Sequence, residues 1–143
     1  MGKTLEPFAY KFVKQIDISE LADFIKSFKS EWLEDTSRQE QTQHHTRTQT
    51  YFISMFSLEY GMSKEYVPEF TCNNPELLDI ALPIILDICK EYNGIHGRIL
   101  LVNLPPHEQI TPHFDKDEYF DICRRVHIPI ITNDRVDFFV DGQ

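Results

Sequence analysis

A histidine and an aspartate two residues apart, His113 and Asp115, are the side chains of this sequence best placed to do chemistry. They stand in a turn between two stretches that are rich in apolar residues. Residues two apart in an extended chain point to the same face, so the imidazole and the carboxylate can reach one ion together. They supply two-thirds of the two-His, one-carboxylate set that binds non-haem Fe(II) and leaves positions open for an organic acid and O2. The pair therefore predicts a metal site whose third ligand comes from elsewhere in the chain.

Two other groups of polar residues could also bind a metal ion. His44 and His45 are neighbours in a polar segment, and adjacent side chains of an extended loop point apart, so we interpret them as a solvated loop. Asp117 and Glu118 extend Asp115 into an acidic cluster that could hold a hard cation through oxygen atoms alone. We interpret this cluster too as a solvated loop.

Size and composition limit the class of protein. With 143 residues, 41% of them hydrophobic, the chain is long enough for one domain with a core of its own. A formal net charge of −9 argues against nucleic acid or an anionic membrane as a partner. No apolar run approaches the roughly 20 residues of a membrane span, and there is no apolar signal core. Three cysteines without CxxC spacing favour a reducing compartment, so we expect a cytoplasmic protein.

The elements that must position His113 and Asp115 begin with a helix-rich part, residues 1–95. The sequence predicts a strand from Phe8 to Ile16, and then a helix that starts at Asp17 or Ser19. The apolar residues of this helix follow the spacing of one buried face: Leu21, Phe24, Ile25, Phe28, Trp32 and Leu33. The polar stretch from Asp35 to Thr50 has no periodicity and is predicted to be a long loop.

Further elements follow from β-branched runs, capping residues and prolines. A strand is predicted from Thr50 to Leu58, and an irregular segment, broken by Pro68, from Gly61 to Asn74. Asn74 as a cap and Pro75 at the first helical position predict a helix that runs to Tyr92 and stops near Gly94. Pro83 should kink this helix or split it in two.

The last part, residues 96–143, has the pattern of a β-core. Strands are predicted over Gly97 to Leu104, Gln109 to Thr111, Arg124 to Ile131 and Val136 to Val140. Helices followed by short strands predict a helical layer against an antiparallel sheet, in an α+β arrangement or a barrel of packed sheets.

A family resemblance lies in the same part of the chain. From Leu104 the sequence reads LPPHEQITPHFD, followed by RRVHIPIITND and then VDFFVDG. This order of motifs resembles the aspartyl/asparaginyl β-hydroxylase family of Fe(II) and 2-oxoglutarate-dependent oxygenases, and it covers about the last third of the chain. The resemblance implies a mainly β fold, with a double-stranded β-helix core of the jelly-roll or cupin-like type and N-terminal helices packed on one sheet.

The resemblance also implies roles for individual residues. His113 and Asp115 correspond to the paired metal ligands, and Arg125 and His127, which share one face of their strand, to contacts with the co-substrate carboxylates or the substrate. The implied cofactors are Fe(II), 2-oxoglutarate as co-substrate, and O2. The implied reaction is hydroxylation of an amino-acid side chain, either Asp or Asn in a protein or peptide, or a free amino acid such as proline.

The chain departs from the family pattern in two places. His107 and Glu108 stand where the family has small residues or glycine, and no histidine follows His127, although the family has a distal histidine and then an arginine there. Three alternatives stay open: the single domain 1–143 is truncated at its C-terminal strands, its site is non-standard, or its metal chemistry is lost. A truncated barrel is expected to be poorly stable or to associate. The rival functions are a non-catalytic jelly-roll binding module and an oligomeric structural protein with an acidic surface.

Overall fold

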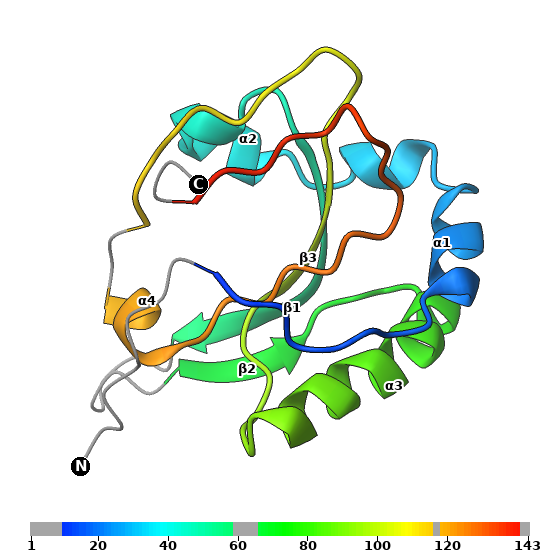
Figure 1. Ribbon diagram of the computed structural model, residues 1–143, viewed down its shortest axis with the longest axis vertical. Coiled ribbons are helices and arrows are strands. Elements are labelled where there is room, and N and C mark those ends of the chain that lie inside the picture. The colour runs from blue at the N-terminus through cyan, green and yellow to red at the C-terminus, as the bar shows by residue number, and fades with distance from the viewer. Residues whose placement is uncertain (1–9, 59–65, 116–117, 141–143) are drawn as a thin grey trace.

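A three-stranded antiparallel sheet lies at the centre of the computed structural model, which describes residues 10–58, 66–115 and 118–140 (Figure 1). The strands are β1 (Gln49–Leu58), β2 (Tyr66–Phe70) and β3 (Ile99–Asn103), in the order β2-β1-β3. Helices pack around the sheet, four of them α-helical among the described residues. The predicted α+β class is therefore confirmed.

The central strand β1 has buried side chains on both of its faces. Thr50 is 1% exposed and Tyr51 6% exposed, and as neighbours in a strand they point to opposite faces. The pairing with β3 shifts between Phe52 and Ser54, so Ile53 is an extra residue in the strand, a β-bulge. The Ile53 carbonyl accepts hydrogen bonds from the backbone N–H groups of Thr71 and Cys72, at 3.0 and 3.3 Å. One face of β1 therefore meets the hydrophobic core and the other meets a polar region.

The hydrophobic core lies between the Tyr51 face of the sheet and the helices. Its buried members are Leu21, Phe28, Tyr51, Ile53, Leu77, Ala81 and Leu101. Phe28 packs edge-on against Tyr51 and Trp32, with ring centroids 5.3 Å apart in both pairs.

The first predicted helix is shorter than its apolar pattern suggested. It ends at Ile25 as α1 (Ser19–Ile25), and a 3-10 turn, η1 (Ser30–Leu33), follows. Ser27 breaks the helix locally, because its hydroxyl donates to the Phe24 carbonyl at 2.7 Å and competes with the backbone ladder. Most of the predicted face still packs on the core, but Leu33 is 63% exposed, so its prediction as a core residue was wrong.

The long helix α3 (Pro75–Glu91) follows the prediction at both ends. The Asn74 side chain accepts a hydrogen bond from the Leu77 N–H at 3.0 Å, and Pro75 occupies the first turn. The Gly94 N–H closes the other end on the Cys89 carbonyl at 2.9 Å. The helix is not split at Pro83, because this residue is exposed and the surrounding turns pack on the sheet. Figure 1 shows α3 lying along one side of the sheet.

Two segments predicted to be irregular contain regular structure. Pro68 lies inside β2, where it pairs with Phe56, and it is tolerated because β2 is an edge strand. The stretch predicted as a long loop contains α2 (Ser37–Gln41) and η2 (Gln43–His45). Thr36 and Asp35 start α2: the Thr36 hydroxyl donates to Glu40 at 2.5 Å, and the Asp35 carboxylate accepts from the Ser37 N–H at 2.9 Å.

Several predicted strands are absent from the part of the chain that the structure describes. Residues 10–16, 109–111, 124–131 and 136–140 form no strand, and Phe8 lies outside the described residues. A short helix, α4 (Glu118–Ile122), precedes the third of these segments. A strand needs a hydrogen-bonded neighbour, and within the described residues none of these segments pairs with the outer edge of β2 or of β3. The C-terminal segment, orange to red in Figure 1, therefore crosses the molecule as extended but unpaired chain.

Candidate functional site

His113 and Asp115 point toward each other, as their spacing predicted. The Nε2 atom of His113 lies 3.8 Å from Oδ1 of Asp115, and the two side chains are 17% and 22% exposed. Nδ1 of His113 donates to the Thr111 carbonyl at 2.7 Å, which leaves Nε2, on the side of Asp115, as the nitrogen that could bind a metal ion. Two ligands of one transition-metal ion have donor atoms about 3 Å apart. A small side-chain rotation would bring this pair to that separation.

Arg125 contacts the other oxygen of the Asp115 carboxylate, Oδ2. The guanidinium of Arg125 therefore holds the carboxylate through Oδ2, while Oδ1 faces His113. Such an outer contact orients a metal-binding carboxylate, and it also neutralises the carboxylate's charge when no metal is bound.

His127 belongs to the same region through electrostatics. Partial desolvation of the imidazole, which keeps an exposed surface, lowers its pKa, the positive charge of Arg125 lowers it further, and Asp115 opposes both effects. Its ring also packs 5.0 Å from the ring of Phe138. The structure thus brings all four sequence-predicted site residues into one neighbourhood, although 124–131 is not a strand.

Two histidines missed as site residues pack directly on His113. The ring of His44 stacks on it with centroids 4.6 Å apart and an interplanar angle of 12°, and His45 meets it edge-on at 5.4 Å. His44 Nδ1 also lies 2.9 Å from the hydroxyl of Thr111. The interpretation of this pair as a solvated loop was wrong, because the 3-10 turn η2 directs both side chains to one ring. The capping residues before α2 were the signal that this segment is folded.

His45 is held in its neutral form. It is 7% exposed, and its Nε2 atom accepts from the Arg38 guanidinium at 3.0 Å, so the proton is on Nδ1. Burial, followed by the charge of Arg38, lowers the pKa of His45 to about 4. Among the described residues, Nδ1 of His45 is buried and has no hydrogen-bond partner. A buried donor without a partner is unusual and is a mark of functional regions.

Two of the described side chains, His113 and Asp115, are placed to bind one metal ion. No three His, Cys, Asp or Glu side chains within the described ranges group closely enough to hold a metal ion. The nearest candidates for a third ligand are engaged elsewhere: His44 with Thr111 and His45 with Arg38. The proposed acidic cluster cannot be placed, because Asp117 lies outside the described residues.

The turn before the pair contains one unfavourable backbone conformation. His107, which stands where the family pattern has a small residue or glycine, has a φ of 66°. This left-handed region favours glycine, because a Cβ atom clashes with the backbone there. Therefore His107, one of the residues at which this chain departs from the family pattern, has a backbone conformation that a glycine would adopt more easily.

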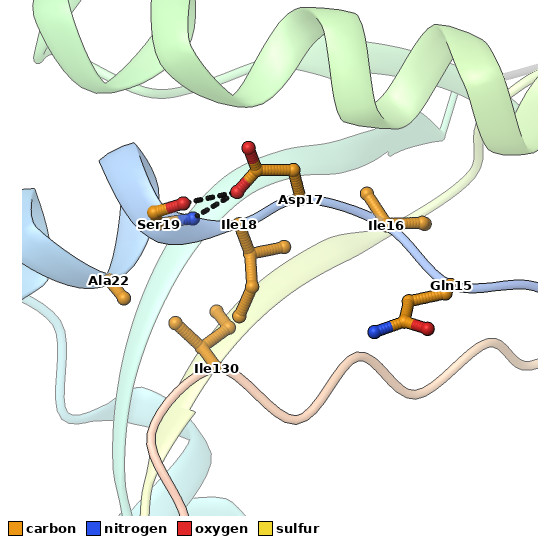
Figure 2. A pocket seen from close by; sticks show the side chains of 7 residues that line it. All are labelled: Gln15, Ile16, Asp17, Ile18, Ser19, Ala22 and Ile130. Carbon is orange, nitrogen blue, oxygen red and sulfur yellow. Dashed lines mark hydrogen bonds between the residues drawn. The ribbon is translucent and has the colours of Figure 1, made fainter.

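A pocket in the described part of the chain lies elsewhere. Figure 2 shows this open pocket, of about 500 Å³, between the chain that leads into α1 and Ile130. Its polar groups Asp17 and Ser19 are hydrogen-bonded to each other, through the Ser19 N–H at 3.0 Å and through its hydroxyl. The pocket contains none of the predicted site residues, so we place the candidate site at His113 and Asp115.

Comparison with known proteins adds no assignment. In the described part of the chain, no helix has the length and apolar character needed to cross a bilayer. No family model matches the chain, and no curated protein or solved structure matches it.

Proposed function

We propose that this chain is the domain of an Fe(II) and 2-oxoglutarate-dependent hydroxylase with a double-stranded β-helix architecture. Its substrate would be an amino-acid side chain in a protein or peptide, or a free amino acid such as proline. The observation that supports it is the convergence of His113 Nε2 and Asp115 Oδ1, 3.8 Å apart. Each side chain also has a second contact that orients it: His113 donates to the Thr111 carbonyl, and Asp115 pairs with Arg125.

In this proposal the residues of the chain bind and orient. His113 and Asp115 would hold the iron, Arg125 would keep the carboxylate turned toward it, and the stacked ring of His44 would shield one face of His113 from water. Arg125 and His127 would contact a carboxylate of the co-substrate. When bound, Fe(II) and 2-oxoglutarate couple the use of O2 and the loss of CO2 to hydroxylation of a C–H bond.

The cysteines support a cytoplasmic location as part of the proposal. Cys72 and Cys89 are half-buried free thiols, which persist in a reducing compartment.

A second candidate function is a non-catalytic binding module. The contact of Arg125 with Asp115 favours it, because an ion pair of this kind holds the loop without any metal. Both candidate functions keep positively charged side chains at the site, so both are compatible with the binding of an anion. They differ in metal binding and in turnover.

Anaerobic titration with Mn(II), a redox-inert substitute for Fe(II), tests the proposal. We expect His113→Asn and Asp115→Asn each to weaken Mn(II) binding by about tenfold or more, because each removes one protein ligand. His107→Asn and Asp134→Asn are matched controls outside the pair, and asparagine tolerates the positive φ of His107. Mn(II) affinity that is the same in all four variants would refute the metal assignment.

Turnover separates the two candidate functions. With Fe(II) and O2, the hydroxylase should convert 2-oxoglutarate slowly to succinate even without substrate, and His113→Asn should abolish this conversion. Mn(II) binding without any succinate formation across candidate amino acids and peptides would favour the binding module.

A further inference from the structure

Another pocket, smaller than the one in Figure 2, lies where the start of α1 meets α3. Its volume is about 240 Å³, and apolar side chains form its walls. Ile18 and Leu21 belong to the α1 side, and Ile80, Pro83 and Ile84 belong to α3. A pocket that encloses a whole small molecule usually has roughly 300 to 1,000 Å³, so this one suits a single long side chain of a larger ligand.

Every charged side chain that lines this pocket in the described part of the chain is a carboxylate. The three are Asp17, Glu20 and Asp79, and all of them are exposed. No described residue forms an ion pair with any of them. Figure 2 shows the Asp17 carboxylate pointing toward the green ribbon of α3, and hydrogen bonds from Ser19 lower its pKa, so it stays ionised. The pocket therefore combines apolar walls with a negatively charged rim.

The helix α3 already binds one lysine of the same chain in this way. Asp79, Pro83, Asp87 and Glu91 are spaced four residues apart and form one row along the helix. At the C-terminal end of the row, the Lys14 ammonium lies 2.7 Å from Asp87 and 3.7 Å from Glu91. The Lys14 side chain is 31% exposed, so much of its stem is covered. The pocket lies at the other end of the row, beside Asp79, where no described lysine or arginine makes an ion pair.

We propose that this pocket binds a lysine side chain of a basic partner protein. The four CH2 groups of the lysine lie against the walls at Ile80 and Ile84, and its ammonium reaches the carboxylates of the rim. An apolar stem that ends in one positive charge matches both the walls and the rim, as the contact of Lys14 with the same helix illustrates. The formal net charge of −9 attracts a basic partner and disfavours an acidic one. The pocket is separate from the candidate metal ligands, so this inference goes beyond the proposed function.

A titration of isotope-labelled protein with the capped peptide Ac-Gly-Lys-Gly-NH2, followed by two-dimensional NMR, tests the site. We expect saturable shifts at the backbone amides of Ile80 and Ile84, with an affinity on the order of millimolar, because one side chain makes few contacts. A peptide with norleucine in place of lysine lacks the ammonium and should bind about threefold or more weakly. A peptide with the shorter diaminobutyrate keeps the charge and loses two CH2 groups, so its binding should weaken roughly fivefold.

Substitutions of the lining carboxylates show whether the lysine binds in this pocket. Glu20→Gln and Asp79→Asn should each weaken binding of the lysine peptide about threefold, since each removes one exposed carboxylate. Asp23→Asn is the matched control, because Asp23 is on the same helix as Glu20, pairs with Lys26 and does not line the pocket. It changes the net charge by the same amount and should leave the affinity unchanged. All three residues are exposed, and thermal melting checks that each variant is folded.

Four results would overturn the inference. The first two are no saturable binding of the lysine peptide and equal affinity for the lysine and norleucine peptides. The third is equal weakening by Asp23→Asn and Asp79→Asn, which would show a general attraction to an acidic protein. The fourth is butylamine that binds about tenfold tighter than the peptide, which would assign the pocket to a free amine. His113→Asn should bind the lysine peptide with wild-type affinity, so failure of the metal assignment leaves this inference standing.

Discussion

The imidazole of His45 connects the cationic and the metal-ligand halves of the site. It accepts from Arg38 on one side and packs against His113 on the other. A protonated His45 could not accept that hydrogen bond, and it would place a second positive charge beside Arg38. The buried position therefore requires the neutral ring, so conditions that protonate His45 should lower the stability of the fold.

Stability should fall in acid because of His45. Between its ordinary pKa of 6.5 and the folded value of about 4, the unfolded chain binds a proton at this residue that the folded chain does not. The free energy of unfolding therefore decreases as the pH falls through this window, by about 1 to 2 kcal/mol from this residue. Urea denaturation of metal-free protein at pH 7 and pH 4.5 measures the decrease. His45→Gln, whose amide oxygen can still accept from Arg38, should show a smaller decrease.

The comparison needs a control variant that removes a different histidine. His107→Asn removes an exposed histidine from a turn and should leave the acid-induced loss at its wild-type size. An acid-induced loss that is equal in all three proteins would show that His45 is not the buried neutral group.

At the scale of elements, the cap of α3 gives a direct test of the fold. Asn74→Ala removes the acceptor of the Leu77 N–H, so the free energy of unfolding should fall by about 1 kcal/mol. Asn73→Ala changes the neighbouring exposed asparagine and should alter stability by less than about 0.5 kcal/mol. Equal effects of the two substitutions in urea denaturation would contradict the capping role of Asn74.

Pro83 gives the opposite expectation in the same helix. An alanine there restores a backbone donor to the Asp79 carbonyl, so Pro83→Ala should raise the free energy of unfolding by about 1 to 2 kcal/mol. Pro106→Ala is a control in an exposed turn, where the added freedom of the unfolded chain should lower stability slightly. Thermal melting compares the two, and a lower melting temperature for Pro83→Ala would show that the helix depends on the proline.

Elements whose signals are local could be predicted from the sequence, and those that need a distant neighbour could not. The cap and proline of α3 and the β-branched run of β1 gave nearly correct ranges, Pro75–Glu91 and Gln49–Leu58. The stretch from Arg124 to Ile131 has an equally strong strand pattern but no strand pairs with it in the described structure. The metal-ligand pair was predictable because His113 and Asp115 are two residues apart. The approach of His44 to Thr111, 67 residues away, had no local signal.

At the scale of the whole molecule, stability depends on a small core on one face of the sheet. Leu77 is fully buried in this core and Leu86, on the same helix, is 60% exposed. Leu77→Ala should lower the free energy of unfolding by about 2 to 5 kcal/mol, because it leaves a cavity among buried side chains. Leu86→Ala should change it by less than about 0.5 kcal/mol. Urea denaturation that gives equal losses for both would place the core elsewhere.

The apolar surface of the C-terminal half bears on how the chain behaves in solution. Many large apolar side chains there are more than half exposed: Phe114, Ile122, Ile131, Val136, Phe138 and Phe139. The expectation that the chain associates, made from the sequence for a truncated barrel, stays a prediction, and these side chains are the surface through which association would occur. Sedimentation at increasing protein concentration measures it, and a monomer at every concentration would contradict it.

The sequence by itself determined the α+β class, the long helix with its caps, the central strand, and the facing of His113 and Asp115, because each depends on residues close together in the chain. Only the tertiary structure decided which further side chains surround that pair. His44 and His45 reach it, and Arg38 reaches His45, because a short helix and a 3-10 turn fold a polar segment back onto the turn before Asp115. The physical reason is that burial and pairing between distant segments are set by the packing of the whole chain and leave no periodic mark in the sequence.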